Sequence, residues 1–294
     1  VSIVALQRGE ISLVQSSLLG SILSNLLLVM GMSFLFGGIL HRGQSGRGLE
    51  QRFTMAIAQT TCSLLALSLA SLVITATLST VLDQSDSRGK DESILNLSRG
   101  TAIVLLVLYV LYLTFQLRTH SNLFDAESQE EGVDEVEEGE PVLDPIAAIT
   151  VLAIATVLVT LCADYLVGSI DDLVEISGIN RAFIGLILLP IVGNAAEHTT
   201  AVLFAVRNKM DLAMSVAIGS SIQIGLLVTP FLVIVGWVTD SPMTFHFETF
   251  QTVAFVVSVL IATVVVQDGK SNYLEGAMLT GLYVIIALAL FFHP

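Results

Sequence analysis

The chain has 294 residues, of which 54% are hydrophobic and 13% are charged, and its mean hydropathy is +0.83. This composition excludes an ordinary water-soluble domain, and the net charge of −14 with no basic patch argues against nucleic-acid binding. Apolar stretches of about 20 residues, enough to cross a bilayer as helices, cover most of the sequence, and no stretch alternates with period two as barrel strands do.

The apolar stretches predict eight helical spans, preceded by a short helical stub at 1–7. The spans cover residues 12–39, 53–82, 100–118, 143–167, 181–207, 211–238, 248–267 and 274–292. The charged stretch 83–99 is expected to be a loop. The chain begins without Met and without a signal-peptide pattern, so we expect its N-terminus to be internal to a longer parent.

Residues 119–142 form an acidic connector between two hydrophobic halves, 1–118 and 143–294. Ten of the 26 acidic residues lie between Asp125 and Asp144. Two interpretations are open: a solvated, partly disordered linker, or a helix that attracts cations. Seven Lys and Arg residues fall on the connector's side of the membrane and five on the other, which favours a cytosolic connector.

One segment of the sequence occurs twice. Residues 1–29 align without a gap with residues 200–228, and eight of the 29 positions are identical, including Gly20 with Gly219. The spans that contain the two copies are five spans apart, an odd number, so they cross the membrane in opposite directions. This pattern predicts an all-α membrane bundle of two inverted five-helix repeats, the first truncated at its N-terminus, as in many secondary transporters.

An acidic residue lies inside an apolar span. Glu197 shares a helical face with Asn194, and an ionised carboxylate at such a depth costs roughly 3 kcal/mol or more, so an intramembrane acid is a functional candidate by default. Pro190 removes a backbone hydrogen bond nearby, and Gly193 is expected to let backbones approach closely. A kinked helix here would free carbonyl oxygens beside the carboxylate. The alternative is a protonated Glu bonded to a neighbouring helix.

Further oxygen-bearing side chains lie on the duplicated spans, where Ser24 aligns with Gln223. Oxygen ligands suit a hard cation such as calcium, and no Cys or His cluster favours zinc or copper. The candidate metal ligands are Glu197, Asn194, Gln223, Ser24, Asn25 and Ser220. For Ser220, close helix packing is an equal alternative. One carboxylate cannot balance a divalent charge, so we expect a second one in an upstream Gly-Asn-x-x-Glu of the first repeat.

His198 adjoins Glu197 but points about 100° away around the helix. It is either a proton-relay or gating residue, or a core histidine bonded to a neighbour. We find no nucleotide-binding loop and no Ser-His-Asp pattern, so we expect neither an enzyme nor a bound cofactor.

Three motifs, Gly193-Asn-Ala-Ala-Glu-His198, Val206-Arg-Asn-Lys-Met-Asp-Leu and Gly219-Ser-Ser-Ile-Gln-Ile224, strongly resemble the calcium/proton exchanger (CAX) family of the cation/calcium exchanger superfamily. Residues 15–29 resemble its other signature region, and the acidic connector matches as well. The resemblance implies a ten-helix core in which Glu197 is one of two carboxylates that bind the cation and exchange protons, with Gln223 and Ser24 lining the site. It also implies that the protein lies in the vacuolar membrane and loads calcium from the cytosol against protons.

We therefore predict a secondary antiporter that exchanges calcium for protons by alternating access, with manganese as a second candidate substrate. The expected partners are the two ions, the lipid bilayer and a second copy of the chain. Three alternatives are open: sodium-coupled exchange, a passive cation channel, and a non-transporting scaffold whose polar residues only join helices. The inverted repeat argues against the last two.

Overall fold

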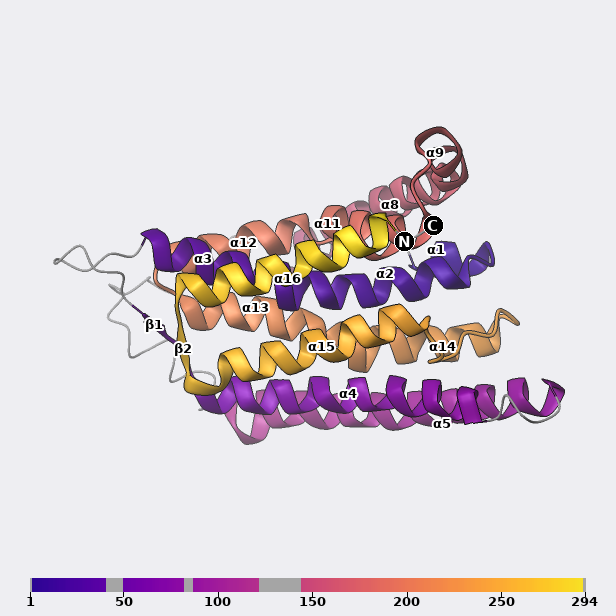
Figure 1. Cartoon of the computed structure of the whole chain (residues 1–294), viewed down its shortest axis with the longest axis horizontal. Coiled ribbons are helices and arrows are strands. Elements are labelled where there is room, and N and C mark those ends of the chain that lie inside the picture. The colour runs from indigo at the N-terminus through magenta and orange to yellow at the C-terminus, as the bar shows by residue number, and fades with distance from the viewer. Residues whose placement is uncertain (1, 41–49, 82–86, 122–143, 293–294) are drawn as a thin grey trace.

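The computed structural model describes residues 2–40, 50–81, 87–121 and 144–292. These residues form a helical bundle whose long helices run roughly along one axis (Figure 1). Seven helices are long and apolar enough to cross a membrane, and one bent pair of helices, Arg181–Gly193 with Ala195–Val206, makes up an eighth span. The all-α fold class and the eight predicted spans are therefore confirmed.

The first half of the chain contributes three of the spans. Its elements are α1 (Ser2–Gln7), α2 (Ile11–Leu23), the π-helical segment η1 (Ser24–Val29), α3 (Met30–Leu40), β1 (Gln51–Arg52), α4 (Met55–Val81), α5 (Ser87–Thr114) and the π-helical segment η3 (Phe115–Thr119). The prediction of a loop at 83–99 is wrong from Ser87 onward, because α5 already begins there. Charged residues such as Arg and Glu form helices readily, so a helix continues beyond the bilayer without losing stability.

The second half contributes five spans. Its elements are α8 (Pro145–Gly168), α9 (Ile170–Ser177), α10 (Arg181–Phe183), η4 (Ile184–Leu188), α11 (Leu189–Gly193), α12 (Ala195–Val206), α13 (Met210–Gln223), η5 (Ile224–Val228), α14 (Thr229–Val238), α15 (Thr249–Val265), η6 (Val266–Asp268), β2 (Lys270–Ser271) and α16 (Tyr273–Phe291). Of the acidic connector, residues 122–143 lie outside the described residues, so both interpretations of it stay predictions.

The duplicated segments have the same local structure. In each, an α-helix passes into a π-helical segment and then back into an α-helix: α2, η1 and α3 in the first copy, α13, η5 and α14 in the second. The two π-helical segments end at Val29 and Val228, which are paired by the 199-residue offset. Figure 1 shows the two copies running in opposite directions along the bundle, which confirms the inverted repeat.

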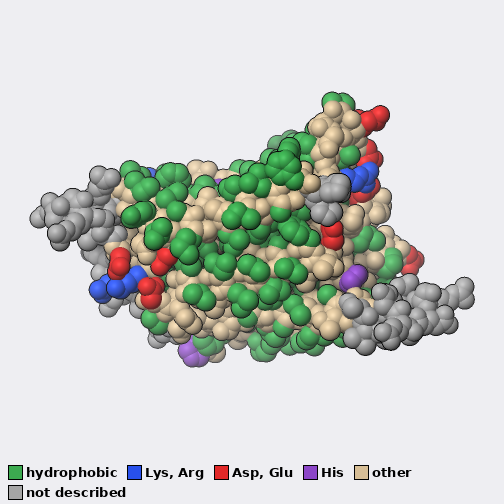
Figure 2. Space-filling view, viewed as in Figure 1, with side chains coloured by type: hydrophobic (Ala, Val, Ile, Leu, Met, Phe, Trp, Pro, Cys, Tyr) green, Lys and Arg blue, Asp and Glu red, His purple; other side chains and the backbone are tan. Residues whose placement is uncertain are grey.

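The surface of the bundle matches a bilayer. Hydrophobic side chains are spread over the face that Figure 2 shows, whereas the charged side chains on that face lie near the two ends of the bundle. α8 is the extreme case, since its exposed side chains include Ile146, Leu152 and Val159. Apolar surface of this extent is stable only in lipid, so the protein is an integral membrane protein.

Polar contacts join the two halves at both ends of the bundle. At one end β1 pairs antiparallel with β2, and the buried Gln51 donates from Nε2 to the carbonyl oxygen of Ala205 (2.8 Å) and to Oδ1 of Asn208 (3.0 Å). At the opposite end Gln15 donates to the carbonyl oxygens of Thr244 (2.9 Å) and His246 (3.1 Å). The two halves are thus one interlocked unit.

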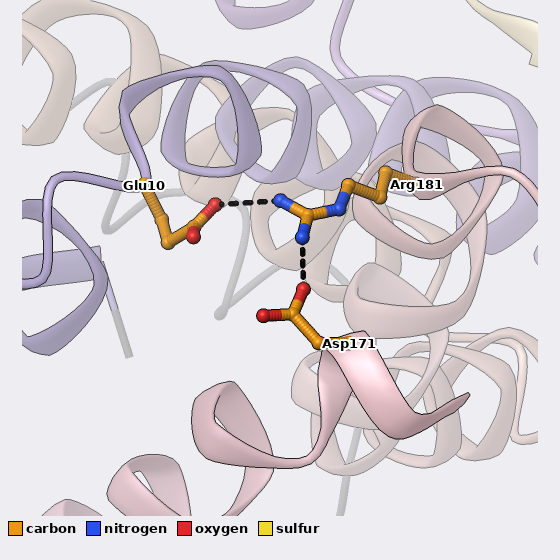
Figure 3. Close-up of polar contacts among 3 residues, drawn as sticks. All are labelled: Glu10, Asp171 and Arg181. Atoms are coloured by element: carbon orange, nitrogen blue, oxygen red, sulfur yellow. Dashed lines mark hydrogen bonds and ion pairs between the residues drawn. The ribbon is translucent and has the colours of Figure 1, made fainter. Parts of the chain in front are cut away.

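The end of the bundle that holds α9 also carries an ion-pair group. Arg181, the first residue of α10, pairs with Glu10 at the start of α2 (3.2 Å) and with Asp171 in the first turn of α9 (Figure 3). A second pair joins Arg8 to Asp164 of α8. All of these side chains are a third or more exposed, so each pair is worth at most about 1 kcal/mol.

Candidate functional site

The span that carries Glu197 is broken. α11 ends at Gly193, α12 begins at Ala195, and the two axes differ by 57°. Asn194 between them has φ −99° and ψ 11°, outside the helical region. The predicted kink is confirmed, and the break lies at Asn194, one turn after Pro190. The close approach expected at Gly193 is wrong, since a Cβ there would meet no atom within 4 Å.

The break in this span lies against the first copy of the duplicated segment. α12 packs on η1, α3 and α13. Asn194 donates from Nδ2 to Oδ1 of Asn25 (3.4 Å), and His198 Nε2 and Ser24 Oγ are hydrogen-bonded at 3.0 Å. Ser24 and Asn25 are fully buried. Four of the predicted site residues are therefore in direct contact, two from each half of the molecule.

Glu197 lies between these two hydrogen bonds on α12. Its Oε2 atom is buried and has no hydrogen-bond partner, and the same is true of Nδ2 of Asn25. Buried polar atoms are almost always paired, so each unpaired one calls for an explanation. Glu197 is half-buried, and it lies on the same helix as Asn194 and His198, which are bonded to the buried Asn25 and Ser24. This arrangement can accept a hard cation, for which oxygen atoms are the preferred ligands.

Gln223 and Ser220 lie on α13 and are not part of the hydrogen-bonded group formed by Asn194, Asn25, His198 and Ser24. Gln223 is exposed and borders a cavity of about 160 Å³ between α4, α5 and α13, together with Asp211 and Tyr112. Ser220 is half-buried. Within the part of the chain that the structure describes, neither side chain hydrogen-bonds to the group around Glu197. Their shared role with Glu197 stays a prediction.

A preassembled metal centre is absent from the described residues, where no three or more His, Cys, Asp or Glu side chains are grouped to hold an ion. The group around Glu197 supplies one carboxylate and otherwise neutral oxygens. One negative charge does not balance a divalent cation, so these residues provide only part of a binding shell.

One residue near this group was missed by the sequence reasoning. Tyr283 of α16 is 3% exposed, and its hydroxyl lies beside that of Ser24. The sequence does hold a pattern that indicates this residue: small and polar residues recur at i, i+4 and i+7 of an apolar helix, at Gly276, Thr280 and Tyr283. These positions form the face of α16 that packs on α3 and η1.

The fold and this region together define a class of protein. Inverted membrane repeats that meet at a broken helix are the architecture of many secondary transporters. The family model described as "Sodium/calcium exchanger protein" matches residues 1–118 and 147–292. The chain belongs to this sodium/calcium exchanger family.

Known proteins with similar sequences carry related names. The chain is 50% identical to the vacuolar calcium ion transporter of Schizosaccharomyces pombe, over 100% of this chain and 68% of the relative. It is 40% identical to a Ca(2+)/H(+) antiporter of Aphanothece halophytica, over 100% of this chain and 78% of that protein. Among solved structures it resembles native YfkE with a TM-score of 0.79 and 34% identity, over 99% of this chain and 79% of that one.

Proposed function

We propose that this protein is a secondary active antiporter that moves calcium across a membrane in exchange for protons. The observation that carries the proposal is the unpaired, buried carboxylate oxygen of Glu197 beside the break in its span, next to oxygen-bearing side chains of the opposite repeat. The names of the relatives support calcium and protons as the exchanged ions.

The proposed cycle uses two properties of a carboxyl group in an apolar span. In this cycle the carboxyl oxygens of Glu197 bind a proton when calcium is absent. A divalent cation stabilises the carboxylate, so the proton leaves when calcium binds. Calcium and protons thereby compete for the same oxygens, and alternating access converts that competition into coupled flux.

In this proposal the calcium ligands are Glu197, Asn194, Ser24 and Asn25, with Gln223 and Ser220 contributing from the second copy. Carbonyl oxygens at the break and water complete a shell of six to eight oxygens, which calcium accepts with irregular geometry. A second carboxylate balances the charge of the ion. His198, whose ring is hydrogen-bonded to Ser24, is the proposed proton relay, and a core histidine bonded to its neighbour is the alternative.

The proposed location is the vacuolar membrane. It rests on the 50% identity to the vacuolar transporter of Schizosaccharomyces pombe and on the vacuolar cation/proton exchangers of Oryza sativa and Arabidopsis thaliana, which are 39–40% identical. In this proposal the acidic connector is cytosolic, which the excess of Lys and Arg on its side supports.

The test is calcium uptake by vesicles that contain the purified protein, driven by an imposed pH gradient. We expect uptake that collapses when a protonophore removes the gradient. Uptake that needs sodium and ignores the pH gradient would replace the proposal with sodium-coupled exchange. Uptake that needs neither gradient would indicate a passive channel, and no uptake together with no calcium binding would indicate a scaffold.

A further inference from the structure

The phenol of Tyr283 is a buried polar group that the proposed calcium shell does not use. The side chain is 3% exposed, and its hydroxyl has no hydrogen-bond partner. Thr280, one turn earlier on α16, likewise has an unpartnered buried hydroxyl. An isolated buried hydroxyl costs about 1–3 kcal/mol, so a tyrosine here is less favourable than a phenylalanine would be unless its oxygen acts in another state of the protein.

The packing of α16 directs this hydroxyl toward the proposed site. Gly276 and Gly31 let α16 and α3 approach closely: a Cβ at Gly276 would lie 2.8 Å from Cα of Leu35, and one at Gly31 would lie 2.6 Å from Oγ1 of Thr280. The same face of α16 continues onto η1, and there the Tyr283 hydroxyl lies beside that of Ser24 without forming a hydrogen bond.

Ser24 is the residue through which Tyr283 can act. A serine hydroxyl has one hydrogen to donate and two lone pairs. In this structure Ser24 Oγ is bonded to His198 Nε2 at 3.0 Å. When a lone pair of Ser24 points at a cation, its hydrogen must point away from that charge, toward an acceptor on the other side. A tyrosine hydroxyl accepts as well as donates, and Tyr283 lies beside Ser24 on a different helix from His198.

We propose that Tyr283 is a positioning residue of the cation site. Its hydroxyl oxygen accepts a hydrogen bond from the Ser24 hydroxyl when Ser24 turns from His198 to a bound cation. Ser24 Oγ then has two alternative hydrogen-bond partners, His198 and Tyr283. This inference rests on the proposed function, because it assigns Ser24 to the cation shell.

The experiment compares Tyr283→Phe with the wild-type protein in calcium uptake by vesicles. The substitution removes one oxygen and leaves the ring, so the packing of α16 is kept. We expect the KM for calcium to rise about 3- to 10-fold, the worth of one neutral hydrogen bond, with little change in the maximal rate. Unfolding without calcium should be no easier than in the wild type, since the lost hydroxyl had no partner. Tyr165→Phe, on the exposed face of α8, is the matched control and should change nothing.

A double-mutant cycle with Ser24→Ala separates positioning from packing. If Tyr283 acts through Ser24, adding Tyr283→Phe to Ser24→Ala should leave KM where Ser24→Ala alone puts it. An equal rise of KM in both backgrounds, or an unchanged KM in Tyr283→Phe alone, would overturn the inference. Absence of pH-driven uptake by the wild type would overturn the proposed function instead. In that case the wild type, the two single variants and the double variant would be compared by the rise in unfolding temperature that calcium produces. An equal rise in the wild type and Tyr283→Phe would overturn the inference about Tyr283.

Discussion

The two copies of the duplicated segment share their backbone structure but differ in what covers them. In the first copy Gly20 lies under the broken span: a Cβ there would collide with the carbonyl oxygen of Leu186 and lie 2.6 Å from Cγ of Pro190. In the second copy a Cβ at Gly219 would meet no atom within 4 Å. One glycine is thus required by a helix contact, and its counterpart is not.

The polar residues of the two copies differ in the same way. Ser24 and Asn25 are fully buried and bonded to His198 and Asn194. Their counterparts are Gln223, which is exposed, and the apolar Ile224. A duplicated sequence therefore fixes the path of the backbone, while the neighbouring helix decides which copy carries a paired polar site. Four pairs of substitutions test this difference.

The largest effect is expected at the carboxylate beside the first copy. Glu197→Gln keeps the size of the side chain but removes its charge and its ability to release a proton, so calcium-driven proton release should fall to that of protein-free vesicles. Glu248→Gln, which changes a carboxylate outside this group that accepts from Gln251, is the control and should keep exchange. Unchanged exchange in Glu197→Gln would remove Glu197 from the mechanism.

The glycine pair gives the next largest effect, on stability. Gly20→Ala forces α2 away from the Leu186 backbone and should cost about 1–3 kcal/mol, as overpacking does. Gly219→Ala meets open space and should be neutral or up to about 1 kcal/mol stabilising, because alanine favours a helix. Thermal unfolding of both variants in detergent measures the difference. Equal destabilisation would show that the two faces are packed alike.

The asparagine pair probes the site rather than the packing. Asn25→Leu gives the first copy an apolar residue, as Ile224 does in the second, and should raise the KM for calcium about 10-fold, the loss of roughly one ligand at 1.4 kcal/mol. Ile224→Leu should leave KM unchanged. Calcium titration of uptake distinguishes them, and an Asn25→Leu variant with wild-type KM would exclude Asn25 from the shell.

The arginine pair should show the smallest effect. Arg8 and Arg207 are matched by the duplication, but Arg8 pairs with Asp164, whereas Arg207 pairs with no carboxylate among the residues that the structure describes. Arg8→Gln should therefore lower stability by no more than about 1 kcal/mol, and by less in high salt. Arg207→Gln should be neutral. Thermal unfolding at two salt concentrations measures both variants. A larger loss of stability for Arg207→Gln than for Arg8→Gln would show that the Arg8–Asp164 pair is not the more stabilising contact of the two arginines.

Much of the fold could be predicted because a bilayer acts on each span separately. Apolar length alone locates a span, since every backbone polar group in lipid must be bonded within its own helix. The duplication and the odd number of spans between its copies then gave the inverted repeat. The prediction failed at 83–99, where charge was interpreted as a loop although α5 begins at Ser87, because in water a helix is limited by propensity rather than hydropathy.

The sequence by itself determined that Glu197, Asn194, Ser24 and Asn25 were candidates, because a polar group in an apolar span is costly wherever that span packs. Only the tertiary structure decided that Asn25 bonds Asn194, that Ser24 bonds His198, that Gln223 is exposed and that Tyr283 lies beside Ser24. These contacts depend on how each helix is rotated and on which helix lies next to it. Hydropathy is almost the same for every rotation of an apolar helix, so side-chain packing between distant segments makes that choice.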